Sequence, residues 1–164
     1  MIFNINQNTT KKEYKPCYLL AKLKEDFTVS TTEQTLYFEK WKQRGSGLFI
    51  NNDGTFEAVH NITFNIDLKI YCYDGFTADS SLQFYLYDTT FRDQETLLNR
   101  FFWNVPAAKP YKHITIKFPY VEDNYGDTLY KIKVKVDKGG GRIRNVSTGD
   151  TTLLMTELFN EDNR

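Results

Sequence analysis

The chain has 164 residues, a length that suits one domain. Lys and Arg total 21, and Asp and Glu also total 21, so no global charge favours nucleic acid or an anionic membrane. No apolar run approaches the about 18 residues that a membrane-spanning helix needs, and the N-terminus has no apolar run of signal-peptide length. We therefore expect one domain made in a cytoplasm, with no nucleic-acid partner and no membrane partner.

Two cysteines, Cys17 and Cys72, are too few for a disulfide framework, and their spacing matches no zinc motif. Both lie among apolar residues in the sequence. We expect them to be buried free thiols.

The N-terminal part of the chain predicts an arm followed by short strands. The first 16 residues are polar and predict an extended arm, and one domain follows over residues 17–164. The segments "CYLLAKL", "TLYFEKW" and "SGLFI" are strand candidates. The cluster "NNDG" at residues 51–54 is a hairpin signal, because Gly accepts the positive φ of a tight turn.

The middle of the chain alternates apolar and polar residues with period two. From Ile62 to Cys72 the even positions are apolar and the odd positions mostly polar, as a half-buried antiparallel strand requires. The segments "SLQFYLYD" and "HITIKF" repeat this pattern. Between them, "RDQETLLNRFF" has a helical alternative, in which Asp93 caps two turns and Leu97, Leu98 and Phe101 pack.

The C-terminal part continues the alternation. In "LYKIKVKVD" the lysines at 131, 133 and 135 are predicted to face outward, and the apolar residues between them inward. A glycine hairpin in "KGGG" and a last strand in "TTLLMTELF" follow. Many short strands separated by turns predict an all-β sandwich or barrel.

A strand start, a corner and a long strand follow one another in the middle of the chain. Gly54-Thr55-Phe56 begins a strand, His60-Asn61 lies at a corner, and the strand continues from Ile62 to Tyr71. A Gly-containing turn then precedes the last strand in "STGDTTLLMTELF". Over roughly residues 17 to 159 this pattern resembles the C1q/TNF-like jelly roll. The family often has Pro-Gly at the corner, where this chain has His60-Asn61; Asn tolerates the left-handed region.

The resemblance implies an antiparallel jelly-roll β-sandwich that forms a homotrimer, packed through aromatic residues on one sheet. Such jelly rolls recur as heads of fibres and as accessory proteins on virions of tailed phages. We therefore expect a non-enzymatic virion structural protein, either a capsid decoration protein or a head-fibre component. Its arm would attach it to the capsid or to other virion proteins.

No residue pattern predicts catalysis, a cofactor site or a metal site. His60 and His113 lie in no zinc or catalytic spacing. Ser46 in "GSG" does not meet the nucleophile-elbow pattern G-x-S-x-G. The segment "VEDNYGD" lacks the EF-hand spacing, and "KGGGRIR" lacks the phosphate-binding pattern of a Walker loop. We expect no enzyme activity and no cofactor.

Two groups of side chains are candidate contact surfaces. The first is an exposed aromatic patch for oligomerisation or a ligand, unless the same chain covers it. Its members are Tyr71, Tyr73, Tyr85 and Tyr87. The second is a basic ribbon for phosphates, a polyanionic glycan or an acidic neighbour, unless its lysines only keep strand edges from pairing wrongly. Its members are Lys131, Lys133, Lys135, Lys138, Arg142 and Arg144.

The aromatic patch supports a second hypothesis for the function. Exposed tyrosines could serve as stacking platforms in a carbohydrate-binding or host-receptor-binding module. Nucleic acid would need aromatic residues on the same face as the basic ribbon, and the ribbon itself contains none.

Overall fold

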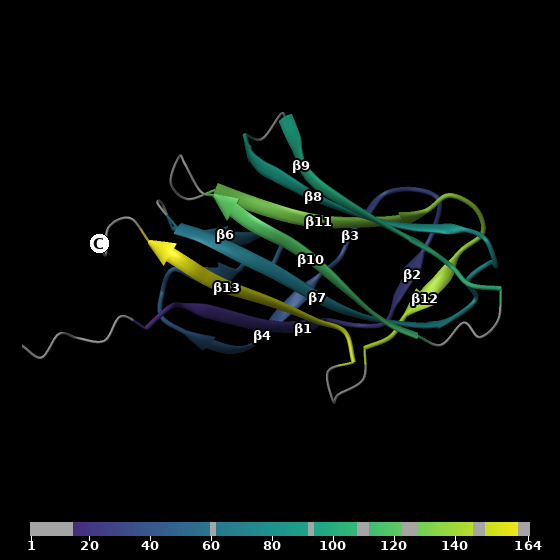
Figure 1. The fold of residues 1–164 in the computed structure, drawn as a ribbon, viewed down its shortest axis with the longest axis horizontal. Helices are drawn as coiled ribbons and strands as arrows, with labels where there is room; N and C mark the ends of the chain where they lie inside the picture. Colours follow the sequence, from purple (N-terminus) through teal and green to yellow (C-terminus); the bar gives the residue numbers. More distant parts are fainter. Residues whose placement is uncertain are drawn as a thin grey trace, which may run out of the picture.

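The computed structural model describes residues 15–59, 62–91, 94–107, 112–122, 128–145 and 150–160, and its regular structure consists of strands in two packed sheets (Figure 1). Sheet A contains β1 (Tyr18–Leu23), β2 (Phe27–Val29), β4 (Phe38–Arg44), β7 (Ile62–Asp74), β10 (Lys112–Glu122), β12 (Gly141–Ile143) and β13 (Thr152–Asn160). Sheet B contains β3 (Gln34–Thr35), β5 (Leu48–Ile50), β6 (Phe56–Ala58), β8 (Ser81–Phe91), β9 (Gln94–Asn104) and β11 (Thr128–Val136).

Short connections carry the chain repeatedly from one sheet to the other. The order in sheet A is β2-β12-β7-β13-β1-β4, and β10 also pairs with β7. The order in sheet B is β5-β6-β11-β8-β9, and β3 also pairs with β11. All pairs between named strands are antiparallel. The predicted all-β antiparallel sandwich is therefore confirmed.

The hydrophobic core lies between the two sheets and is built by alternate residues of each strand. Along β11 the even residues from Thr128 to Val136 are buried and the odd ones are half-buried, as the alternation predicted. The Tyr130 ring stacks on Phe56 at 6.4 Å and meets the edge of Phe64 at 5.4 Å. These rings join the inner faces of both sheets, since Phe64 comes from β7 and the other two from sheet B.

Both cysteines are free thiols, as predicted. Cys72 is fully buried, and this burial raises the pKa of its thiol to about 12. Cys17 is half-buried, and the pKa of its thiol is also raised, first by burial. Neither is therefore an activated thiolate at neutral pH.

The predicted turn at residues 51–54 is confirmed as the hairpin between β5 and β6. Ile50 pairs with Phe56, and Gly54 has a φ of +84°, which favours glycine. The chain then leaves sheet B at Ala58 and resumes in sheet A at Ile62. The predicted corner at His60-Asn61 and residues 1–14 of the predicted arm lie outside the described residues.

The helical alternative for "RDQETLLNRFF" is wrong, because its described residues, from Gln94 on, belong to the edge strand β9. The first seven residues of β9 are exposed, so no buried face imposes an alternation there. The pairing of β8 with β9 also shifts register between Leu86 and Tyr87, which places Leu97 opposite Tyr87 and Asn99 opposite Leu86. This irregularity brings two consecutive leucines, Leu97 and Leu98, to the surface. Their positions relative to Phe101 had suggested one face of a helix.

The glycine segment after β11 is also not the predicted hairpin, because β11 belongs to sheet B and β12 to sheet A. Its close packing explains the glycines. A Cβ atom on Gly141 would lie 2.3 Å from the Phe76 ring carbon Cδ1, and Phe76 packs against the core.

We expect Gly141→Ala to lower the free energy of unfolding by about 1–3 kcal/mol, because the new methyl group must displace the Phe76 ring. Urea unfolding measures this change. In a Phe76→Leu background the same substitution should have a smaller effect, as expected for residues in contact. If the substitution lowered the free energy of unfolding equally in both backgrounds, the cause would be strain in the backbone and not contact with the Phe76 ring.

Candidate functional site

The four predicted tyrosines do not form one patch. Tyr71 and Tyr73 lie on β7 in sheet A, whereas Tyr85 and Tyr87 lie on β8 in sheet B. The outward faces of the two sheets point to opposite sides of the sandwich, so this grouping was wrong. Tyr85 is only 8% exposed and therefore offers no open stacking platform.

On sheet A, the two tyrosines lie in a row of ring and guanidinium contacts. The Tyr71 ring centroid lies 4.4 Å from that of His113 on β10 and 6.4 Å from that of Tyr73. The guanidinium groups of Arg142 and Arg144 lie over the Tyr73 ring at 5.2 and 5.0 Å. Both distances are typical of cation–π contacts. These contacts connect the β12 segment to β7.

Both arginines also have acidic partners. Arg142 donates two hydrogen bonds to the Asp74 carboxylate, both of 2.6 Å, and Arg144 lies 3.9 Å from Asp150. The Arg142 guanidinium lowers the pKa of the Asp74 carboxyl group. The positive charge of this region is therefore largely balanced within the chain.

The predicted basic ribbon is divided between the two sheets. Its lysines at 131, 133 and 135 lie on β11 in sheet B, while its two arginines belong to the β12 segment. The ammonium groups of Lys133 and Lys135 lie over the rings of Tyr87 and Tyr85 at 5.1 and 5.7 Å. Aromatic residues from β8 thus lie next to the ribbon, although the ribbon contains none of its own.

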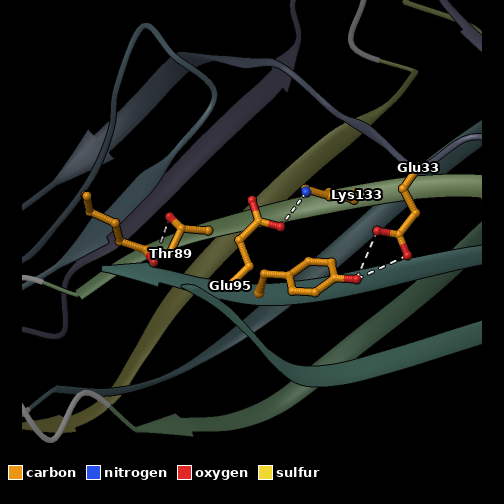
Figure 2. A network of polar contacts seen from close by, with 6 residues as sticks. Glu33, Thr89, Glu95 and Lys133 are labelled. Carbon is orange, nitrogen blue, oxygen red and sulfur yellow. Dashed lines mark hydrogen bonds and ion pairs between the residues drawn. The ribbon is translucent and has the colours of Figure 1, made fainter. Parts of the chain in front are cut away.

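A polar network holds this part of sheet B together (Figure 2). The Tyr87 hydroxyl donates to the Glu33 carboxylate at 2.9 Å, and the Lys133 ammonium contacts Glu95 at 2.5 Å. Lys133 is thereby engaged by both a carboxylate and a ring. These contacts join β8, β9 and β11 to the segment that precedes β3.

Tyr87 provides a test of this network. Burial, followed by its hydrogen bond to Glu33, raises the pKa of Tyr87 to about 12. A raised folded-state pKa gives a stabilising contribution that is present below about pH 10, the ordinary value, and is lost as pH rises through 12. We expect Glu33→Gln to lower the titration midpoint only in part, since burial remains. The difference in alkaline ultraviolet titration between the chain and its Tyr87→Phe variant measures the midpoint.

The described residues do not assemble a catalytic or metal site. His113 is exposed on β10, and Ser46 is exposed in the turn after β4. No group of three or more His, Cys, Asp or Glu side chains within the described ranges could hold a metal ion. No helix in those ranges is long and apolar enough to cross a membrane. His60 and residues 123–127 of the acidic loop lie outside the described residues.

One exposed apolar surface was missed by sequence reasoning. We call it the β9–β10 edge and define it as Leu97, Leu98, Phe102 and Tyr120, which are 44%, 45%, 48% and 71% exposed. Leu98 and Tyr120 line a hollow of about 190 Å³ between the two strands. Within the described residues, each strand is bonded on one side only, β9 to β8 and β10 to β7.

Tyr120 has an unusual backbone conformation. Its φ is +52°, and the pairing of β10 with β7 shifts register between Phe118 and Val121, so Tyr120 lies in a bulge. Its backbone N–H donates to the Asn65 side chain at 3.0 Å. A bulge that presents a large ring outward in a strained conformation is a feature that functional surfaces often use.

No family model matches the sequence, and no curated protein matches it. Solved structures do match. The crystal structure of murine APRIL at pH 5.0 has a TM-score of 0.61 at 12% identity, covering 88% of this chain and 100% of that chain. The structure of Eiger TNF from S. frugiperda has a TM-score of 0.62 at 14% identity, covering 89% and 95%. The chain therefore has a TNF-like jelly-roll fold, and the predicted fold class is confirmed.

Proposed function

We propose that this chain is a non-enzymatic structural protein of a phage virion that forms a homotrimer through the β9–β10 edge. The observation that carries the proposal is the open apolar surface of that edge. Monomeric proteins seldom expose several large apolar side chains together, and such patches mark protein–protein contacts. An uncovered edge strand is also a hazard, because it can pair with other chains.

The outer face of sheet A offers a surface that could receive this edge from a second copy. Leu20 on β1 lies opposite Leu154 on β13, and both are half-buried in the single chain. Tyr18 and Leu158 extend the same outward positions along these strands and are also half-buried. A heterologous contact between two different surfaces closes into a ring when its rotation permits, which suits a trimer.

The virion setting is supported by the TNF-like fold, since jelly rolls of this type recur on phage particles. Free thiols at both cysteines fit folding in a reducing cytoplasm. β1 begins and β13 ends at the same end of the sandwich, since Tyr18 pairs with Thr156 (Figure 1). In this proposal the predicted arm, residues 1–16, leaves from that end and binds the capsid or another virion protein.

Detection of the chain on particles tests the virion role. Virions purified from the phage that encodes the chain should be labelled by an antibody raised against it. Deleting residues 1–16 should abolish binding of the purified chain to particles without changing its oligomeric state. Particles that lack the chain at every stage of assembly would contradict the virion role, even if the chain is a trimer.

A further inference from the structure

A polar hollow of about 320 Å³ lies on sheet B and shares no lining residue with the β9–β10 edge defined above. The turn after β5 contributes Asp53, the end of β8 contributes Thr89 and Phe91, and β9 and β11 contribute Glu95 and Lys131. Figure 2 shows Thr89 and Glu95 on this part of the sheet. The volume falls at the lower end of the about 300–1,000 Å³ that small-ligand sites occupy.

The apolar side chains that line the hollow are Leu129 and the exposed ring of Phe91. This ring is 70% exposed, although phenylalanine is one of the residue types most often buried. It therefore contributes little to the core and leaves an aromatic face open beside the polar groups. An aromatic face of this kind can pack against an apolar ligand surface.

The polar component consists of side chains that other residues hold in place. Asp53 Oδ1 accepts hydrogen bonds from the Thr55 N–H at 2.9 Å and the Thr55 hydroxyl at 2.5 Å. These bonds lower the pKa of the Asp53 carboxyl group, so it is an ionised acceptor at neutral pH. The Lys133 ammonium holds Glu95 at 2.5 Å on the other side. Lys131 adds an ammonium donor to the lining.

We propose that this hollow binds a neutral sugar unit of a glycan. A pyranose ring has an apolar C–H face, which suits Phe91, and hydroxyl groups that both donate and accept hydrogen bonds. The carboxylates of Asp53 and Glu95 accept from those hydroxyls, and the ammonium of Lys131 donates to them. With the Lys133 ammonium paired to Glu95, two carboxylates and two ammonium groups balance around the hollow, so no excess of positive charge favours phosphate, sulfate or sialic acid.

The site differs from the predicted tyrosine platforms and does not depend on the homotrimer. The tyrosines of β8 are engaged by lysines, and Tyr85 is buried. Every lining residue of the hollow that the proposal uses comes from one chain. A monomeric chain that still binds sugar through Phe91 would therefore refute the trimer and leave this site standing.

A glycan array with the full chain, followed by calorimetric titration of the neutral oligosaccharides that bind, tests the site. We expect Phe91→Ala to weaken binding about tenfold, which corresponds to roughly 1.4 kcal/mol, within the range of aromatic contacts. Phe159→Ala removes another exposed ring, 45% exposed on β13, and should leave binding unchanged. Glu95→Gln should weaken binding by about tenfold or more, since hydrogen bonds to charged groups are the stronger ones.

Three outcomes would overturn the proposal. The first is that no neutral glycan binds the full chain. The second is that Phe91→Ala and Phe159→Ala bind with the same affinity as the unaltered chain. The third is that only sulfated or sialylated glycans bind, because the hollow has no excess of positive charge that would favour them.

Discussion

Phe64→Ala is expected to lower the free energy of unfolding by about 3–5 kcal/mol. Phe64 is fully buried, and its ring lies edge-on to Tyr130 at a centroid distance of 5.4 Å. Removing the ring leaves a cavity between the two sheets, where neighbours from both sheets can close it only in part. Urea unfolding followed by circular dichroism measures the loss.

Phe159→Ala is the matched control for this change, because the same atoms are removed from a ring that is 45% exposed. Its effect should stay within about 0.5 kcal/mol, as is usual for surface positions. If Phe64→Ala were no more destabilising than the control, the two sheets would not be packed around Phe64 as described.

Leu98→Asp is expected to convert the proposed trimer to a monomer. Leu98 is 45% exposed and lines the hollow of the β9–β10 edge beside Tyr120. In the trimer this position would be buried, and an unpaired buried carboxylate is strongly destabilising. In the single chain the aspartate would stay in water, so the fold should be retained. Light scattering on a sizing column gives the mass, and circular dichroism checks the fold.

Thr31→Asp serves as the control, because it adds the same charge to an exposed position outside the β9–β10 edge. It should leave the trimer intact. Tyr120→Ala should weaken the trimer without adding a charge, since large rings are frequent hot spots of interfaces. A trimer that survives both Leu98→Asp and Tyr120→Ala would show that the edge is not the contact.

The strands with one buried face could be predicted from the sequence, because burial imposes the alternation. β7 and β11 show this most clearly, since their inward residues are apolar and buried almost without exception. β9 could not be predicted in this way. It is an edge strand exposed over most of its length, and a shift in register places Leu97 and Leu98 side by side at the surface.

The grouping of surface residues could not be predicted, because it depends on which sheet each strand joins. Local pattern shows that Tyr71 and Tyr85 belong to strands, but long-range pairing places those strands in different sheets. The same pairing brings Lys133 to Tyr87 and Arg142 to Tyr73. Tyr71, Tyr73 and Tyr87 are half-buried, whereas Tyr85 is buried, and the pattern did not predict which residues would lie next to them.

The turn at residues 51–54 also shows that local pattern predicts an element but not its neighbours in the fold. The glycine and the short polar residues predicted a hairpin, and this is confirmed. The lining that Asp53 shares with Phe91, Glu95 and Lys131 depends on residues 38 to 78 positions further along the chain. No local pattern indicates that contact.

The solution mass of the full chain, measured by light scattering on a sizing column, tests the central claim most directly. The proposed function predicts a single species of three times the 19.3 kDa chain mass, stable on dilution to micromolar concentration. A species of one chain mass at every concentration would contradict the homotrimer, and the apolar β9–β10 edge would then need a different partner.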